Sequence, residues 1–305
     1  MCTRSFFGVV KYILDDLFDE LESEGWEDVI RDRLNQLGKG YLSRAHGGPI
    51  NYRYSEKATR FAYIYRYVAA DAYGVFNRIG RYSILEDLFK KPSVQVSCLG
   101  GGPGSDLLGI QKFLASKGLQ TQLTCYNYDR ESGWQTAWNS LCRVLSSSLT
   151  YPSSYKFQQL DVMQQAYCSQ YSDLYHSDLF TMSFFLSEFL QQLDDVTPFM
   201  SHLFEHAKSG ACFLFIDNYR ESVARWFDKC VGAYNRCYPR SPLRSGTYGQ
   251  EAGCNNVCLP RPQEEDAAAL GYYYKRLHLC RPQRAADLGI PRQHLKINYR
   301  IYCKQ

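Results

Sequence analysis

The residues best suited to chemistry are a glycine-rich loop and two acids that follow it along the chain. The loop runs from Gly100 to Gly104 as Gly-Gly-Gly-Pro-Gly, directly after the apolar run Val94–Leu99, and it leads into Ser105 and Asp106. Glycines permit positive φ angles and let a ligand lie against bare backbone. A helix that begins near Ser105 would add free N–H groups. This pattern indicates a backbone cradle for a ligand, although a simple tight turn between strand and helix has the same composition.

The two acids each end a later apolar run. Asp129 follows the run Gln122–Asn127, about 25 residues after the glycines. An acid at that point can accept hydrogen bonds from both ribose hydroxyls of a nucleoside, but Asp129 could equally cap the next helix. Asp161 closes the following run and could bind an adenine amino group, or it too could be only a cap.

The elements that must position these residues alternate along the chain from Ser93 onward. Short apolar runs alternate with helical stretches, which favours a mostly parallel sheet with helices on both faces. The last two runs have no helix-length segment between them, so we expect an antiparallel edge there. We therefore predict an α/β fold with a seven-stranded, mostly parallel, Rossmann-like sheet and an antiparallel C-terminal edge. The predicted strands are Val94–Leu99, Gln122–Asn127, Lys156–Leu160, Asp178–Ser183, Ala211–Ile216, Tyr272–Leu279 and Lys296–Tyr302.

Residues 1–92 have a different pattern, which predicts an N-terminal helical cap in front of the domain formed by residues 93–305. Apolar residues recur at helical spacing in the first twenty positions, then over Glu27–Leu37, where two glycines should end the helix, and again over Ala58–Ile79. Within the second domain, residues 235–270 are rich in Pro, Gly, Arg and Cys and lack periodicity, so we expect a long irregular insertion there.

Five stretches in this order resemble the motifs of class I S-adenosylmethionine (SAM) dependent methyltransferases. The glycine loop resembles the first motif, Asp129 the ribose-binding acid, and Asp161-Val162 the adenine-contacting pair. The stretch 177–188 resembles the fourth motif, and 209–217 resembles the turn and strand that follow. The resemblance covers about residues 93–305. It implies SAM as the cofactor and a cofactor site built from Gly100, Gly101, Gly102, Pro103, Gly104, Asp106, Asp129, Asp161, Val162 and Ser183.

The chain departs from the family pattern at one position. The family usually has an acid two residues before the first motif glycine, where it helps to hold the methionine end of the cofactor, and this chain has Cys98 there. Asp106, just inside the next helix, could take over part of that role. The glycine loop also lacks the GxGxxG spacing of a dinucleotide-binding dehydrogenase.

The residues for catalysis and for the acceptor are less well marked. Methyl transfer requires orientation of the two reactants, and it requires a general base only if the acceptor is protonated. Glu188, Ser187 and His176 are candidates for a base near the fourth motif, with a solvated helix or surface loop as the alternative. Tyr54, Arg60 and Tyr63 are candidates for substrate binding, since interleaved arginine and aromatic residues suit base stacking. The alternative is a helix packed on the sheet with its arginines in solvent.

The charge distribution bears on the acceptor. Residues 218–305 carry 15 Lys/Arg against 7 Asp/Glu, a net charge of +8, within a chain whose net charge is +4. A basic C-terminal third could attract RNA, and the 100–106 and 181–188 stretches loosely resemble fungal ribosomal-RNA uridine-N3 methyltransferases. The other classes are a methyltransferase for a small molecule or a protein side chain, and a non-catalytic SAM-binding or scaffold protein.

The remaining composition indicates where the chain resides. No apolar run has the roughly 18 residues of a membrane span, and the N-terminal segment resembles an amphipathic helix more than a signal peptide. The 12 cysteines lack CxxC spacing, so we expect no metal site, and we expect reduced thiols in a cytoplasmic or nuclear protein. The sequence leaves the oligomeric state open.

Overall fold

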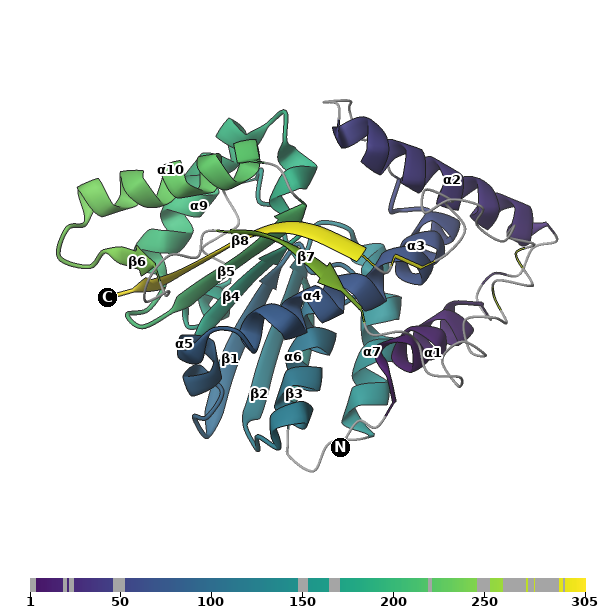
Figure 1. Cartoon of the computed structure of the whole chain (residues 1–305), viewed down its shortest axis with the longest axis horizontal. Helices are drawn as coiled ribbons and strands as arrows, with labels where there is room; N and C mark the ends of the chain where they lie inside the picture. The colour runs from purple at the N-terminus through teal and green to yellow at the C-terminus, as the bar shows by residue number, and fades with distance from the viewer. Residues whose placement is uncertain are drawn as a thin grey trace.

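One eight-stranded sheet with helices on both faces forms the framework of the chain (Figure 1). The computed structural model describes residues 4–18, 21, 25–45, 53–147, 153–164, 171–218, 221–245, 253–259, 273, 277, 291–292 and 294–305. The helices are α1 (Phe6–Phe18), α2 (Trp26–Ala45), α3 (Lys57–Tyr63), α4 (Ala69–Ile79), α5 (Ser83–Leu88), α6 (Ser105–Lys117), α7 (Gln135–Ser146), α8 (Ser172–Tyr175), α9 (Leu193–His206) and α10 (Glu221–Cys237). The strands are β1 (Ser93–Leu99), β2 (Gln122–Asp129), β3 (Ser154–Gln159), β4 (Leu179–Ser183), β5 (Cys212–Asn218), β6 (Leu243–Ser245), β7 (Gly253–Cys258) and β8 (His294–Lys304).

The sheet has the order β3-β2-β1-β4-β5-β8-β6, with β7 also paired to β8. The first five strands are parallel, and β8 runs antiparallel to its three partners. The order 3-2-1-4-5 is that of a Rossmann-like sheet, whose ligands bind at the carboxyl ends of the strands near the point where the strand order reverses. Here that point lies between β1 and β4. The predicted α/β class is confirmed. The predicted antiparallel C-terminal edge is also confirmed, and it is formed by β8 with β6 and β7.

The strand count, the irregular structure expected for residues 235–270 and the strand expected at Tyr272–Leu279 were wrong. The sheet has eight strands, not seven, and β6 and β7 lie inside the 235–270 segment that we expected to be irregular. Both pair with β8, whose free backbone groups on that side need partners. The predicted strand Tyr272–Leu279 is helical at Tyr273, and the Leu277 N–H donates to the Tyr273 carbonyl. The other residues of that prediction lie outside the described part of the chain. Tyr273 and Leu277 are both buried and four residues apart, which is the spacing of one helical face.

Two hydrophobic cores, one on each face of the sheet, hold the layers together. Helices α1 to α7 cover one face together with the side chains of β1, β2 and β8 that point toward them. Helices α8, α9 and α10 cover the other face, and Figure 1 shows α9 and α10 side by side over the β5 end of the sheet. The N-terminal helices share the first core with the sheet, because α1 packs on α7 and α4 packs on α6.

The N-terminal helices also differ from the prediction in detail. Helix α2 continues through Gly38 and Gly40 to Ala45, so the predicted end at the glycines was wrong. A glycine inside a helix costs only about 1 kcal/mol relative to alanine, so two glycines are not enough to end α2. The predicted helix Ala58–Ile79 is one helical stretch, but its middle, Ile64–Val68, is a π-helical turn, a feature frequent near functional sites. None of the helices in the described ranges is long and apolar enough to span a bilayer.

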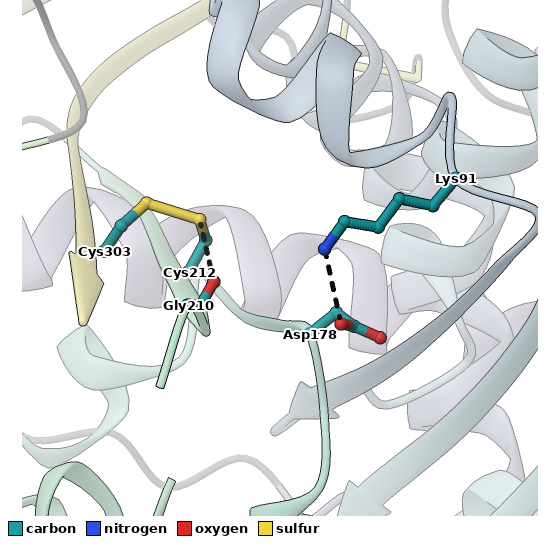
Figure 2. The surroundings of a disulfide bond; sticks show 5 residues. All are labelled: Lys91, Asp178, Gly210, Cys212 and Cys303. Carbon is teal, nitrogen blue, oxygen red and sulfur yellow. Dashed lines mark hydrogen bonds and ion pairs between the residues drawn. A yellow bond between two sulfur atoms is a disulfide. The ribbon is translucent and has the colours of Figure 1, made fainter. Parts of the chain in front are cut away.

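A disulfide joins the two strands on the antiparallel side. Cys212 and Cys303 face each other on β5 and β8, with Cα atoms 4.2 Å apart, and their sulfur atoms are bonded (Figure 2). This corrects our expectation that all thiols are reduced. The sequence could not show the pairing, because the two cysteines are 91 residues apart and meet only through the register of β5 with β8. Near the same end of the sheet, Lys91 points to Asp178, with the ion pair at 3.9 Å (Figure 2).

The contact between α4 and α6 gives a prediction about packing. A Cβ at Gly109 of α6 would lie 2.5 Å from the Ala72 carbonyl oxygen and 2.8 Å from the Val75 Cβ. Gly109→Ala should therefore destabilise the fold by about 1–3 kcal/mol despite its better helix propensity. Gly232→Ala on α10 is the matched control, because its Cβ meets only the Arg236 guanidinium at 3.7 Å, and it should stabilise by about 0.5–1 kcal/mol. Chemical denaturation measures both, and equal effects in the two variants would contradict this packing.

Candidate functional site

The glycine loop lies at the carboxyl end of β1, where the sheet order reverses. Gly100 has φ +62°, and a Cβ there would lie 2.0 Å from the Phe185 ring, so only glycine fits at this point. Gly102 has φ +49°, and its Cβ would meet nothing closer than 3.7 Å. At Gly100 the loop backbone thus packs closely against Phe185, which follows the end of β4. At Gly102 an added Cβ would make only ordinary contacts with Trp134 and Asp129, and its bare backbone lines a cavity.

Asp129 at the end of β2 fixes the same loop from the side. Its Oδ2 accepts the Gly102 N–H at 3.0 Å, and its Oδ1 accepts the Glu131 N–H at 2.9 Å. Each carboxylate oxygen has a second lone pair, so both can still accept hydrogen bonds from a ligand. Burial raises the pKa of Asp129 to about 6, against the lowering effect of these two N–H donors. Asp129 does not cap the next helix: Glu131 caps the 3-10 turn Ser132–Trp134 by accepting the Gly133 N–H, and Trp134 is the N-cap residue of α7.

Asp106 in the first turn of α6 is a buried carboxylate with one oxygen unused. Asp106 is only 1% exposed, and its Oδ2 accepts a hydrogen bond from the Thr181 hydroxyl at 2.8 Å. Its Oδ1 is buried without a hydrogen-bond partner within bonding geometry, although the Ser183 hydroxyl lies near the same carboxyl. Burial raises the pKa of Asp106 to about 6, and the hydroxyls of Ser183 and Thr181 partly offset that rise. A buried acceptor without a partner costs free energy, so this oxygen is suited to a donor supplied by a ligand.

One cavity with an empty volume of about 1180 Å³, part of it open to solvent, brings most of the predicted site residues together. The cofactor candidates that line it are Gly100, Gly101, Gly102, Pro103, Asp106, Asp129, Asp161, Val162 and Ser183. Glu188, Tyr54 and Tyr63 line it as well. Asp161 also accepts the Met163 N–H at 3.0 Å, so it holds a turn while it faces the cavity.

Four candidates lie outside the lining of this cavity. Gly104 is the N-cap residue before α6, and a Cβ there would meet Leu141 and Trp138 in the core. Ser187 is buried, and its N–H donates to Asp217. His176 is exposed in the turn before β4, at the opposite end of that strand from the cavity. Arg60 is buried, and its guanidinium donates to the Tyr54 and Ser55 carbonyls, so it holds the segment that carries Tyr54 rather than facing a substrate.

Several lining residues were not found from the sequence. Asp71 on α4 and Trp134 before α7 both line the cavity. Asp71 is an acid on the apolar face of a long helical pattern, beside Val68, Ala72 and Val75, and that placement was a signal of a functional carboxylate that we did not use. The aromatic residues at the end of β4, Phe184, Phe185 and Phe189, also line the cavity.

Phe184 marks the strand end by its backbone. It has φ +57°, the only positive φ among the non-glycine residues that the structure describes. Such a conformation costs of order 1–3 kcal/mol and is concentrated at functional sites. The Phe184 N–H donates to the Ile216 carbonyl at 2.7 Å, and this bond to β5 holds the turn in place. The strain therefore lies where β4 opens into the cavity.

Cys98, at the position where the family has an acid, is buried and does not contribute a group to the cavity. Its sulfur lies 3.6 Å from that of Cys125 on β2. The carboxylate nearest in sequence that does line the cavity is Asp106. The acid that could hold a cationic group beside the glycine loop thus comes from the helix and not from β1.

The cavity is strongly acidic. Its charged lining residues are Asp71, Asp106, Asp129, Arg130, Glu131, Asp161 and Glu188, six acids against one arginine. In a partly buried site, such an excess of carboxylates favours a ligand with positive charge and disfavours a phosphate chain.

Comparisons with known proteins find no matching protein-family model and no matching curated protein sequence. Solved structures do resemble the chain. A SAM-dependent methyltransferase from Methanosarcina mazei is 11% identical, with 73% of this chain and 97% of that chain covered, at a TM-score of 0.38. An O-methyltransferase family protein from Burkholderia thailandensis is 12% identical, with 92% and 70% covered, at 0.44. The N-methyltransferase NodS from Bradyrhizobium japonicum is 10% identical, with 75% and 96% covered, at 0.37. Because these TM-scores are below 0.5, we derive the function from the residues of the chain itself.

The raised pKa of Asp106 predicts how stability depends on pH. Since the folded pKa lies above the unfolded value, the native state binds more protons between about pH 4 and pH 6, and stability falls as pH rises through this window and levels off above it. Asp106→Asn removes this loss. As the pH is raised from 5 to 8, the free energy of unfolding of the variant should increase by about 1–2 kcal/mol relative to that of the wild type. Urea denaturation at both pH values measures this change. Comparing the two proteins cancels the other titrating groups, and a constant difference across this range would contradict the burial of an ionisable Asp106.

Proposed function

We propose that the chain is a SAM-dependent methyltransferase. The observation that supports this most is the convergence of the glycine loop, Asp129, Asp161 and Asp106 on one cavity at the switch point of a Rossmann-like sheet. Each of these groups suits a different part of the cofactor: bare glycine backbone that a ligand can approach closely, a ribose-binding acid, an adenine-contacting acid and a buried carboxylate for the amino group.

The adenosyl half of the cofactor fits the β2 and β3 ends. Asp129 keeps acceptor capacity for two ribose hydroxyls after its bonds to Gly102 and Glu131. Asp161 and Val162 follow β3, one polar and one apolar, as an adenine edge and face require. Trp134 adds an aromatic wall on the Gly102 side, because a Cβ added at Gly102 would lie 3.7 Å from its ring.

The methionine half fits the start of α6. The Asp106 Oδ1, buried and without a partner, is placed to accept from the ammonium group of SAM. A charge-assisted hydrogen bond of this kind is stronger than a neutral one, and it would replace the contact that the family obtains from the acid missing at Cys98. The excess of acids in the cavity also suits a cofactor with a sulfonium and an ammonium group.

When bound, SAM supplies an activated methyl group, and the chain has to orient the acceptor and exclude water. The aromatic side chains of Tyr54, Tyr63 and Phe185 also line the cavity and are not among the cofactor contacts proposed above. The segment 54–63 comes from the N-terminal region, so we propose that residues 1–92 cap the site and contribute to acceptor binding.

An RNA acceptor has the basic C-terminal third in its favour, with a net charge of +8 over residues 218–305. The acids around the cavity favour a smaller acceptor or a protein side chain, because they repel phosphates close to the site. A non-catalytic SAM-binding protein would show the same affinity for SAM and no methyl transfer to any fraction of a cell extract.

Two substitutions test the cofactor site by calorimetry with SAM. Gly102→Arg places a long side chain in the cavity, and Asp129→Ala removes the ribose acceptor and frees the Gly102 N–H. Each should weaken SAM binding at least about 10-fold, since a hydrogen bond to a charged group contributes about 1.5–3 kcal/mol. His176→Ala is the control, because His176 is exposed and outside the cavity lining. The affinity of this variant for SAM should stay within about 2-fold of the wild-type value. Unchanged affinity in both site variants would refute this assignment.

A further inference from the structure

Asp71 is another buried carboxylate in the same cavity, and the cofactor contacts proposed above do not use it. It lies on α4, is 3% exposed, and lines the cavity together with residues from the sheet. Its proposed ligand is the acceptor that would receive the methyl group, so its role rests on the proposed function.

One oxygen of Asp71 is available to a ligand. The Oδ2 accepts the Tyr63 hydroxyl at 3.3 Å, while the Oδ1 is buried without a hydrogen-bond partner. Among the described residues Asp71 forms no ion pair, although Arg292, Asp106 and Asp217 lie close enough to influence it. A buried charged oxygen without a partner is costly, so Asp71 is suited to a ligand that brings both a donor and positive charge.

Aromatic rings stand beside this carboxylate. The Tyr63 ring packs edge-on against Tyr54 and Trp134, with centroids 5.6 Å and 5.5 Å away, and tilted against Tyr67 at 5.2 Å. Tyr54, Tyr63 and Trp134 all line the cavity. A carboxylate next to aromatic rings is the combination that recognises ammonium groups, because the ring faces attract a cation and the carboxylate accepts its N–H bonds.

We propose that Asp71, with the aromatic wall formed by Tyr54 and Tyr63, binds the acceptor as an ammonium group and removes its proton. The proton passes from R–NH₃⁺ to the Asp71 carboxylate, which leaves a neutral amine with a free lone pair. A bond then forms between that nitrogen and the methyl carbon, the methyl carbon–sulfur bond breaks, and its electron pair stays on the sulfur of the thioether product. Asp71 gives the proton to solvent when the product leaves.

The electrostatics of the site support this role. Burial raises the pKa of Asp71 to about 7, with Asp106 and Asp217 adding to the rise while Arg292 and the Tyr63 hydroxyl oppose it. A carboxyl group that titrates near neutral pH can both accept a proton and release it in each cycle. The amine can come from a small metabolite or from a lysine side chain, since both present the same group.

The first test separates Asp71 from the cofactor site by calorimetry with SAM on the full chain. Asp71→Asn should leave the affinity for SAM within about 2-fold, whereas Asp106→Asn, its matched control in the same cavity, should lose at least about 10-fold. An equal loss in the two variants would place Asp71 in the cofactor site and overturn the proposal. Absence of SAM binding by the wild type would instead contradict the proposed function.

The second test identifies the acceptor with methyl-labelled SAM and an extract of cells that express the chain. Label should appear in small molecules retained by cation exchange at neutral pH or in methyllysine from hydrolysed protein, and Asp71→Asn should lower it at least about 100-fold. Label found only in RNA, only in neutral or anionic metabolites, or in no fraction while SAM binds would each contradict an amine acceptor.

A third variant covers the case in which Asp71→Asn does not fold. Tyr63→Phe keeps the aromatic ring and removes the hydroxyl that favours the ionised form of Asp71. It should shift the acidic limb of the pH–rate profile for the labelled amine to higher pH while the affinity for SAM at pH 8 stays unchanged. An unshifted limb would contradict proton transfer to Asp71.

Discussion

The hydrogen bond from the Gly102 N–H to Asp129 is the interaction on which the site depends. It joins the loop after β1 to the end of β2, and it exists because the parallel register sets Leu99 beside Tyr128. The Gly100 and Gly101 N–H groups both donate to the Tyr128 carbonyl, so the loop turns at the end of β2 and brings Gly102 to the carboxylate. The Asn127 side chain closes the arrangement by donating to the Gly102 carbonyl at 2.8 Å. The Gly102 backbone that lines the cavity is therefore held in place by bonds within the protein itself.

A second constraint is the burial of several carboxylates around one cavity. Asp71, Asp106 and Asp129 come from α4, α6 and β2, and burial raises the pKa of all three. Because burial outweighs the nearby arginines, keeping these carboxylates ionised lowers the stability of the fold. A cationic ligand removes that unfavourable term, so the free energy that the fold loses to burial is recovered on binding. This is the physical link between the stability of the chain and its proposed choice of ligands.

The sequence predicted the parallel half of the sheet well because most of its strands, β3 excepted, are short apolar runs followed by a polar end. The same reasoning found Asp129 and Asp161, since acids at strand ends meet at one edge of a parallel sheet.

The sequence analysis did not find Asp71, because the helix that carries it reaches the cavity only through the packing of α4 on α6. It also failed for β6 and β7, whose pairing with β8 joins segments far apart in the chain, and for the Cys212–Cys303 bond, which depends on that tertiary register. Arg60 shows the opposite error, since its sequence context suits substrate binding while its guanidinium is used to hold backbone carbonyls.

The most direct measurement is a crystal structure of the chain with S-adenosylhomocysteine, the demethylated product of SAM. The account predicts the ribose hydroxyls on the Asp129 carboxylate, the amino group on Asp106, and the ligand backbone against Gly102, with the Asp71 carboxylate left free for the acceptor. A ligand bound elsewhere, or bound in this cavity without contact to Asp129 and Asp106, would contradict it.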